Sequence, residues 1–333
     1  MKPRNIHLLF FLIILLMFSV RNVFAHTPDK PTDNESLATA YTISDPAKSW
    51  AIYAELHEGG EGQYYRFDLP QDERLRVQLF VPTSEKSSFV PNLVVMGPGI
   101  TSQDAVPEYV ETVEALGVML LEGQRSSSPT YEPFTPSSFY ELASVDQEVS
   151  AGGTYHVAVY EPSQGGHYGL AIGYKEQFGL DEFIRIPIDV IGIHQWEGQS
   201  LLFIFAPLIL TLVIGLAILV LKRPATLRTL FGGIGIFAGL LYLGSGFMTL
   251  TQTILALTTA NPDLGVVLTA IFVLIPILLA LAIFRLTFHR KQITVRTRVL
   301  MAILGVLGLF AWAGLLIGPA LALIVSFLPS KRF

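Results

Sequence analysis

The sequence predicts a chain of two unlike parts: an exported all-β sandwich or jelly roll, followed by an all-α bundle of four transmembrane helices. Three observations predict this fold class: a short apolar run near the N-terminus, a strongly acidic region after it, and long apolar stretches in the second half. Only 15% of the 333 residues are charged, whereas soluble chains average about 25%. The second half of the chain therefore belongs in a membrane.

Charge is distributed unevenly along the chain. Residues 26–198 hold 26 of the 27 acidic residues but only 9 of the 22 Lys and Arg residues, a net charge of −17. Because nucleic-acid binding depends on a basic surface, this balance excludes nucleic acid as a partner. The chain has no cysteine, which excludes disulfides, thiolate metal sites and cysteine nucleophiles.

Residues 1–25 are predicted to be a signal peptide. Lys2 and Arg4 precede an apolar run over 8–20, and Val23 and Ala25 are small residues at the two positions that a signal peptidase reads. The run has about 13 residues, whereas a spanning helix needs about 20. We therefore expect cleavage after Ala25 and export of the acidic region.

Basic residues predict the orientation of the four apolar stretches, which are 201–221, 229–257, 264–284 and 299–328. Lys and Arg fill the connections 222–228 and 285–298, while the connection around Asn261 has none. Because such residues concentrate on the cytoplasmic side, we expect a multi-pass protein of the cytoplasmic membrane with both basic loops inside. Four crossings would place the acidic domain and the C-terminus outside.

The predicted spans contain no Asp, Glu, His, Lys or Arg, although proton relays, ion pathways and haem sites need such groups. Gln252 is their only strongly polar side chain; it is expected to bond between helices, with lining of a site as the alternative. Ser245 lies in a Leu-Gly-Ser-Gly segment that resembles the serine motif of rhomboid-type proteases. No span carries a histidine to activate it, which excludes that activity.

Two glycine pairs are expected to mark helix packing. Gly235 and Gly239 lie four residues apart in the second stretch, and Gly314 and Gly318 in the fourth. At this spacing two small residues share one helix face and let another backbone approach closely. The contact is expected within the bundle or between copies of the chain.

Residues 47–178 are predicted to form the sandwich, after a polar lead-in over 26–46 that we expect to be mobile. In the clearest strand Leu75, Val77 and Leu79 alternate with polar residues, so one face is apolar. No convincing amphipathic helix interrupts the pattern, which favours an antiparallel sandwich. The predicted strands are 50–56, 63–69, 74–81, 92–96, 117–122, 139–145, 153–160 and 167–174.

Several strand and turn segments carry a family resemblance: Gln63-Tyr64-Tyr65-Arg66-Phe67-Asp68-Leu69-Pro70, Glu73-Arg74-Leu75-Arg76-Val77, Gly153-Thr154-Tyr155-His156-Val157-Ala158-Val159 and His167-Tyr168-Gly169-Leu170-Ala171-Ile172. They resemble the bacterial pre-peptidase C-terminal domain, a β-sandwich appended to secreted enzymes. The resemblance implies an accessory or binding module without catalytic residues. The chain departs from that family because no peptidase is attached and a Pro/Ser-rich segment is inserted at 123–138.

The inserted segment is longer than an ordinary hairpin loop, and such loops are often functional. Tyr131, Phe134 and the following Phe139 are candidate recognition residues. The alternative is that these aromatic side chains hold the loop against the sandwich.

The connector 179–199 is too apolar for a free linker. Pro187 and Gly192 disfavour a continuous helix there. We expect the connector to pack at the membrane interface and hold the sandwich close to the bundle, with Trp196 as an interfacial anchor.

Two metal hypotheses follow from the histidines. Glu55, His57, Glu58 and Glu61 form an acidic patch with one imidazole, which could hold a divalent cation; a solvated turn is the alternative. Cleavage after Ala25 would leave His26 as the first residue, whose α-amine and imidazole together can chelate copper. Its second ligand would be one of the histidines elsewhere in the exported domain: His57, His156, His167 or His194.

The favoured function is that of a non-enzymatic envelope protein, with the sandwich as a binding module and the helices as its anchor. The expected partners are the lipid bilayer and a protein or glycan outside the membrane, and a homo-oligomer or membrane complex stays open. No cofactor is expected unless copper or another divalent cation binds. The alternatives are a copper-handling envelope protein using His26 and a subunit of a transport complex.

Overall fold

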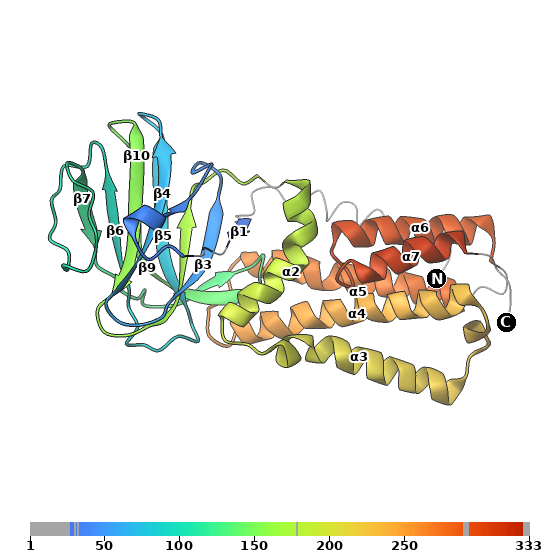
Figure 1. The fold of residues 1–333 in the computed structure, drawn as a ribbon. Coiled ribbons are helices and arrows are strands. Elements are labelled where there is room, and N and C mark those ends of the chain that lie inside the picture. The colour runs from blue at the N-terminus through green and yellow to red at the C-terminus, as the bar shows by residue number, and fades with distance from the viewer. Residues whose placement is uncertain (1–26, 30, 32, 178, 289–292, 329–333) are drawn as a thin grey trace.

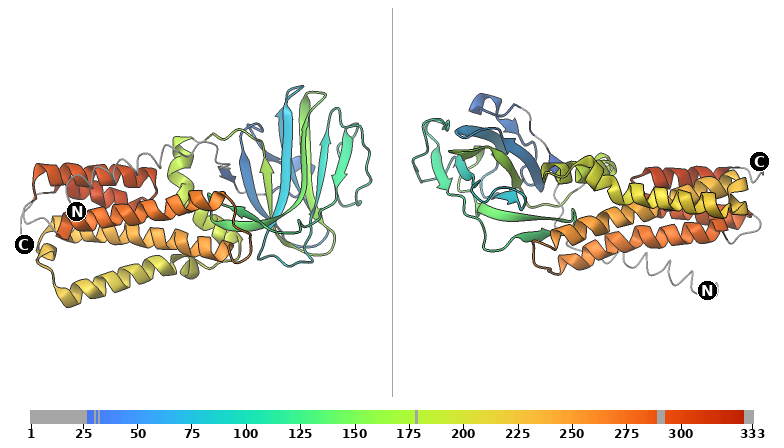
Figure 2. Two further views of the ribbon diagram at one scale, coloured as in Figure 1. Left: turned by 180° about the vertical axis from the view of Figure 1, so that it is seen from behind. Right: turned by 90° about the horizontal axis from the view of Figure 1, so that it is seen from below.

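The computed structural model describes residues 27–328, apart from 30, 32, 178 and 289–292. A β-sandwich and a helical bundle lie end to end, and the long helices point away from the sandwich (Figure 1). Figure 2 shows the same arrangement from behind and from below. We call the end of the bundle beside the sandwich the proximal end and the opposite end the distal end.

The described strands form two sheets. One has six strands, in the order β1 (Thr27–Asp29), β3 (Trp50–Leu56), β11 (Gly166–Ile172), β5 (Arg74–Pro82), β9 (Ser137–Glu148) and β8 (Thr130–Glu132). The other has five, in the order β2 (Tyr41–Thr42), β4 (Glu61–Leu69), β10 (Gly153–Glu161), β6 (Asn92–Gly97) and β7 (Gly117–Leu121). Every pairing is antiparallel except β1 with β3 and β2 with β4.

The predicted sandwich is confirmed, since each of the eight predicted strands is present with small shifts at its ends. The unpredicted strands are β1, β2 and β8, which have two or three residues each and are too short for a period-two pattern. β1 and β2 come from the lead-in, which also forms the 3-10 turn η1 (Leu37–Thr39). The described part of the lead-in thus adds an edge strand to each sheet.

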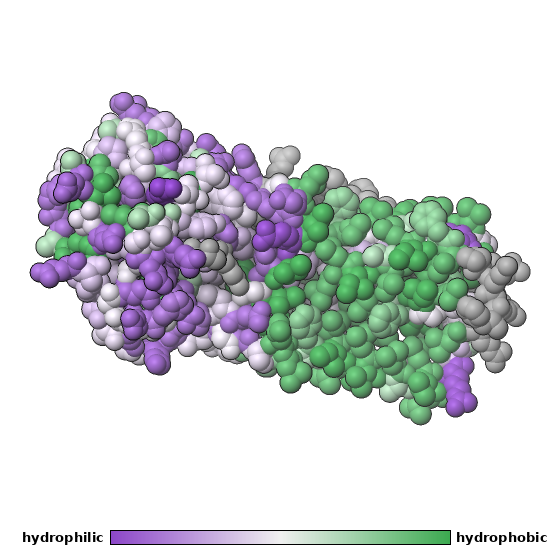
Figure 3. Space-filling view, viewed as in Figure 1, coloured by the Kyte–Doolittle hydropathy of each residue, from purple (hydrophilic) through white to green (hydrophobic). Residues whose placement is uncertain are grey.

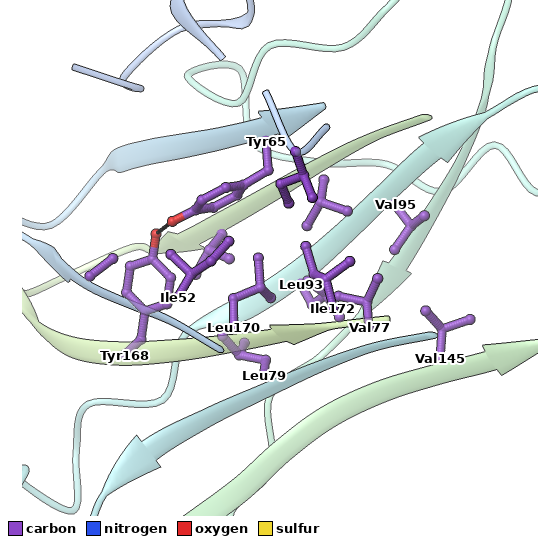
Figure 4. Close-up of a cluster of buried hydrophobic side chains, with 14 of the residues drawn as sticks. Ile52, Tyr65, Val77, Leu79, Leu93, Val95, Val145, Tyr168, Leu170 and Ile172 are labelled. Carbon is purple, nitrogen blue, oxygen red and sulfur yellow. Dashed lines mark hydrogen bonds between the residues drawn. The ribbon is translucent and has the colours of Figure 1, made fainter. Parts of the chain in front are cut away.

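The core lies between the two sheets. Leu75, Val77 and Leu79 point into it and are each at most 1% exposed, as the alternation along that strand predicts. Figure 4 shows Tyr65 and Tyr168 meeting in the same core, with their hydroxyl oxygens 2.6 Å apart. Each large side chain buried in this way stabilises the fold by about 1.5–3 kcal/mol, which explains how a domain without cysteine holds together.

Within the described residues, three helices are long and apolar enough to span a membrane: α3 (Leu201–Lys222), α4 (Leu230–Ala256) and α5 (Gly265–Phe288). The 3-10 turn η2 (Ala225–Arg228) joins the first two. α4 lies at the centre, against α3 and α5, whereas α3 exposes most of its apolar side chains. Figure 3 shows a hydrophobic surface over the bundle and a largely polar one over the sandwich.

The fourth predicted span, 299–328, is not one helix. α6 (Val295–Phe310) and α7 (Ile317–Phe327) lie side by side, joined by a reversing turn over 311–316 (Figure 1). Arg298, at the start of α6, donates hydrogen bonds to the carbonyl oxygens of Ser326 and Leu328 at the end of α7. The prediction of a fourth spanning helix is therefore wrong. Leu328 lies at the distal end with the basic loops, not beside the sandwich as four crossings require.

The sequence pattern missed this reversal because the turn is as apolar as the helices that it joins. Trp312, Leu315 and Leu316 have φ values of 48°, 55° and 66°, and Gly314 also has φ 66°. A left-handed residue other than glycine costs on the order of 1–3 kcal/mol. A contact from α4 offsets part of this cost, since the backbone N–H of Gly314 donates to Ser245 Oγ at 2.7 Å.

The connector is a continuous helix, α2 (Leu180–Trp196), despite Pro187. A proline has no N–H to donate to the carbonyl four residues earlier, which here is the carbonyl of Phe183. The indole Nε1 of Trp312 donates to that oxygen instead, at 2.8 Å. The expectation that Pro187 and Gly192 interrupt the helix is wrong because the reversing turn supplies the missing donor. α2 lies across the proximal end of the bundle (Figure 1).

Candidate functional site

Trp196, the last residue of α2, joins the sandwich to the bundle. Its Nε1 donates to the carbonyl oxygen of Ala54 in β3 at 2.9 Å. Its ring meets Tyr53 edge-on at 4.9 Å and Phe80 at 6.1 Å between centroids, and only 8% of the residue is exposed. The prediction of an interfacial anchor is wrong, since the sandwich covers the ring.

The inserted segment makes a second contact, between β8 and the bundle. Tyr131 is 3% exposed, and its hydroxyl donates to Thr269 Oγ1 in α5 at 2.8 Å. Phe134 lies edge-on to Phe272 at 5.7 Å and to Trp312 at 6.0 Å. These two candidate recognition residues therefore contact the chain's own helices.

Phe139 is the third candidate recognition residue, and it lies half-buried on the outer face of the six-stranded sheet, in the cluster of Phe80, Ala171 and Trp196. Its ring lies 4.8 Å from that of Phe80. The alternative reading, in which an aromatic side chain holds the loop against the sandwich, describes Phe139 but not Tyr131. The described loop is a docking element between the two parts of the chain.

Glu132 lies at this junction, where its Oε1 accepts a hydrogen bond from the backbone N–H of Phe134 at 3.0 Å. Burial raises the pKa of its carboxyl group from 4.5 to about 7, and the nearby carboxylates of Asp263 and Glu176 add to the rise. Hydrogen bonds from the backbone act in the opposite direction. Glu132 is therefore half protonated near neutral pH.

Lowering the pH from about 8 to about 5 is expected to stabilise the folded chain by on the order of 3 kcal/mol through Glu132. The folded-state pKa lies above the unfolded one, so the folded state binds the proton more tightly. Burying the ionised carboxylate therefore lowers the stability of the folded chain most above pH 7, and this loss of stability disappears below about pH 4.5. Glu132→Gln keeps an acceptor for the Phe134 N–H and should remove this dependence. The unfolding temperatures of the wild type and of Glu132→Gln, each measured at both pH values, test this prediction. The same change in unfolding temperature with pH in the two proteins would contradict it.

A polar cleft of about 560 Å³ opens on the sandwich beside the C-terminal end of α2. Asp33 and Glu35 reach it from the lead-in, and Glu55 from the end of β3. His57 and His167 also line it, and no Lys or Arg is among its described lining residues. At neutral pH this lining is negative and attracts cations.

His167 lies between two carboxylates at the edge of the cleft. Its Nε2 is 3.5 Å from Glu55 Oε2, and its Nδ1 is 3.4 Å from Glu85 Oε2. The backbone N–H of His167 also donates to Glu85 Oε2, at 3.0 Å. Glu85 thereby fixes one side of the imidazole, while Glu55 stays half exposed and available to a ligand.

Glu35, His57 and Glu61 bring one ligand atom each within 4.8 Å of one another. An imidazole nitrogen with carboxylate oxygens suits a divalent transition metal. Glu61 is already engaged, because its Oε2 accepts from the backbone N–H groups of His57 and Glu58 at 2.6 and 3.3 Å. From the predicted acidic patch, Glu55 and Glu58 stay outside the cluster, and Glu35 joins it from the lead-in.

His26 lies outside the described residues. The next residue, Thr27, pairs with Trp50 at one end of β3, whereas His57 follows the other end of that strand. The two ends are about 23 Å apart at 3.3 Å per residue. His156 lies on β10, in the other sheet. The described chain thus brings His57 to the acidic cluster, at the end of β3 opposite to Thr27.

Two polar side chains of the bundle, Gln252 and Ser245, have hydrogen-bond partners within the chain. Gln252 and Gln199 exchange amide hydrogen bonds of 2.7 and 2.9 Å, which tie α4 to the connection before α3 and not to another helix. Ser245 Oγ donates to the carbonyl of Tyr242 at 2.9 Å and accepts from Gly314. Both roles of this hydroxyl are structural, so it is not a nucleophile in this arrangement.

The two glycine pairs differ in the structure. A Cβ at Gly235 or Gly239 would come within 2.6 Å of a side chain of α5, so these glycines allow close packing inside the bundle. A Cβ at Gly318 would meet the ring of Tyr242 in α4 at 2.6 Å. Gly314, however, lies in the reversing turn, so the second pair does not form one continuous helix face.

The sequence missed two contributors to the cleft, Asp33 and Glu35. They come from the polar lead-in, whose sequence shows no alternating pattern that would predict a strand. The only local signal is the density of acidic residues between 29 and 35. Their position depends on contacts between distant residues, such as the Asn34 amide donating to the Tyr64 carbonyl.

A comparison with protein-family models finds no match for this chain, and a comparison with curated proteins finds none either. The resemblance to the pre-peptidase C-terminal domain stays a prediction. The site is therefore interpreted from its own geometry and chemistry.

Proposed function

We propose that the chain is a membrane-anchored protein of the cell envelope whose acidic sandwich is a binding module outside the cytoplasmic membrane. Its cleft would take cationic groups of a partner, either a basic protein segment or an amine-bearing glycan. The observation that carries the proposal is the cleft of about 560 Å³, which gathers carboxylates from separate segments and has no basic side chain among its described lining.

The distribution of basic residues supports this orientation. Lys222 and Arg223 end α3, and Arg296 and Arg298 lie in the first turn of α6. The end of α3 and the start of α6 both lie at the distal end of the bundle, away from the sandwich (Figure 1). Positive charge favours the cytoplasmic side, so the sandwich belongs on the outer side.

The outward face of α2 supports a position at the outer membrane surface. Leu180, Ile184 and Ile188 are 86%, 58% and 69% exposed, and their spacing of four puts them on one helix face. An apolar stripe of this kind on a helix lying across the spans fits the boundary of head groups and acyl chains. The cleft opens beyond the other end of the same helix, near Trp196.

Neutralising the cleft is expected to weaken binding of a cationic probe about tenfold. The probe is a fluorescent lysine-rich peptide, titrated against the full chain in nanodiscs by fluorescence anisotropy. In the variant, Glu35→Gln and Glu55→Gln together remove two charges that face one ligand, and each close charge pair is worth on the order of 0.5–1 kcal/mol. Binding should also weaken at high salt.

The matched control removes the same charge elsewhere on the sandwich. Glu108 and Glu114 are exposed residues of the loop between β6 and β7, and Glu108→Gln with Glu114→Gln should leave the affinity unchanged. Equal weakening by the two double variants would mean that the peptide responds to net charge alone. That result would remove the cleft as the site.

A second candidate function is the handling of copper or another divalent cation, which the cluster of Glu35, His57 and Glu61 favours. Isothermal titration of the full chain with Cu²⁺ and Zn²⁺ tests it. One ion per chain is expected, with binding lost in His57→Ala and kept in His156→Ala. Binding that survives His57→Ala but fails when the mature N-terminus is blocked would point to His26 alone, and absence of binding would reject the function.

A further inference from the structure

A cavity of about 110 Å³ lies beneath α2, among α4, α5 and the reversing turn. Its walls are mainly apolar and include Ile186, Phe272 and Trp312. These three residues belong to α2, α5 and the reversing turn, respectively. We call this space the inner cavity.

One imidazole that lines the inner cavity has a nitrogen available to a ligand. His194 is only 2% exposed, and its Nδ1 lies 2.8 Å from Glu197 Oε2. In a neutral imidazole, a carboxylate beside Nδ1 favours the tautomer that carries its proton on Nδ1, and in that tautomer Nε2 is an acceptor. Among the described residues, none donates a hydrogen bond to Nε2.

A second space, the outer cavity, lies on the sandwich side of the same junction and has a volume of about 240 Å³. Pro136 and Gln252 line both cavities, so these two side chains lie between them. Glu197 lines the outer cavity, and neither cavity has a Lys or Arg among its described lining residues. Most polar side chains that line the outer cavity carry hydroxyl groups, and they come from both the sandwich and the bundle: Thr83, Ser84, Ser137, Ser138, Thr258 and Thr259.

We propose that the two cavities together bind a neutral, hydroxyl-bearing membrane lipid of the acylglycerol class. Its polar head lies in the outer cavity, and a hydroxyl near the boundary donates to His194 Nε2. The apolar segment next to the head lies in the inner cavity. An engineered cavity of about 150 Å³ takes one benzene ring, so only a short segment fits, and the rest of the chain stays in the bilayer.

The chemistry of the walls selects this class of lipid. A phosphate head group would lie beside the Glu197 carboxylate with no described cation in the walls to offset the repulsion. A neutral polyol instead exchanges hydrogen bonds with the hydroxyl and amide groups of the outer cavity. The junction lies where the hydrophobic surface of the bundle begins (Figure 3), so a lipid reaches it without leaving the membrane.

The test is photolabelling of the full chain in nanodiscs with a monoacylglycerol that carries a diazirine close to its head group. A phosphatidylglycerol analogue with the same chain is the comparison. Peptide mapping should place the monoacylglycerol label in α2 and the reversing turn, at least about fivefold above the anionic analogue. His194→Phe, which keeps a ring but removes the acceptor, should lower the label about fivefold.

A matched pair of variants tests the inner cavity. Thr249 lines it and Thr251, two residues along α4, does not. Thr249→Trp fills the space and should lower labelling about tenfold, whereas Thr251→Trp should leave it unchanged. Equal labelling in the two variants, or by the two lipids, would overturn the proposal. If Thr249→Trp does not fold, unchanged labelling in His194→Phe overturns it by itself. None of these substitutions touches the acidic cleft.

Discussion

Replacing Trp196 by alanine is expected to raise the rate at which trypsin cuts after Arg185 by at least about a hundredfold. Trp196 fixes the end of α2 to Ala54, Tyr53 and Phe80 of the sandwich. Truncating a buried tryptophan costs about 3–5 kcal/mol. When reclosing is fast, cutting follows the population of the open form, and Arg185 lies within α2, where only an opened helix fits a protease.

Trp196→Phe is the matched control for this experiment. It keeps an aromatic ring between Tyr53 and Phe80 but loses the hydrogen bond to the Ala54 carbonyl, which is worth about 1 kcal/mol. A rise in cutting rate of about fivefold is therefore expected. If Trp196→Ala is cut at the wild-type rate, the sandwich is held by the Tyr131 contact and not by Trp196.

The C-terminus is expected to lie on the same side of the membrane as the loop between α3 and α4. The chain has no cysteine, so single cysteines report accessibility without background. An impermeant maleimide should label Asn261→Cys in intact cells, and should label Arg223→Cys and Arg332→Cys only after permeabilisation. Four residues after Leu328 reach at most about 14 Å, which is too short to cross a core of about 30 Å.

The three positions separate two kinds of error. Labelling of Arg332→Cys together with Asn261→Cys would mean that the chain crosses the membrane a fourth time and that α6 and α7 open into one span. Labelling of Arg223→Cys together with Arg332→Cys, with Asn261→Cys protected, would mean that the whole bundle is inverted. The second result would agree with the reversal between α6 and α7 but would contradict the proposed position of the sandwich outside the membrane.

The regular part of the fold was predictable because it follows from local periodicity. Leu75, Val77 and Leu79 alternate along β5 as a half-buried strand requires, and the core contains all three. The continuity of α2 was not predictable, since Pro187 is tolerated only because Trp312, far along the chain, takes the carbonyl of Phe183. No local pattern contains that contact.

The candidate site was predictable to a smaller extent. His57 and its acidic neighbours were visible as a dense polar turn, but Glu35 reaches them from a segment without a strand signal. His194 and Ser245 line one cavity although they lie on different helices. The composition thus shows that side chains able to bind a ligand are present. Which of them come together depends on the packing of elements that are distant in the chain.

The reversal between α6 and α7 also bears on the order in which the protein is assembled. These helices have 16 and 11 residues, about 24 and 17 Å at 1.5 Å per residue, so neither crosses the hydrocarbon core alone. Their turn bonds to Ser245 of α4 and to Phe183 of α2, both of which the ribosome makes earlier. α6 and α7 therefore pack against helices that are synthesised before them, so their partners are already available when this pair is made.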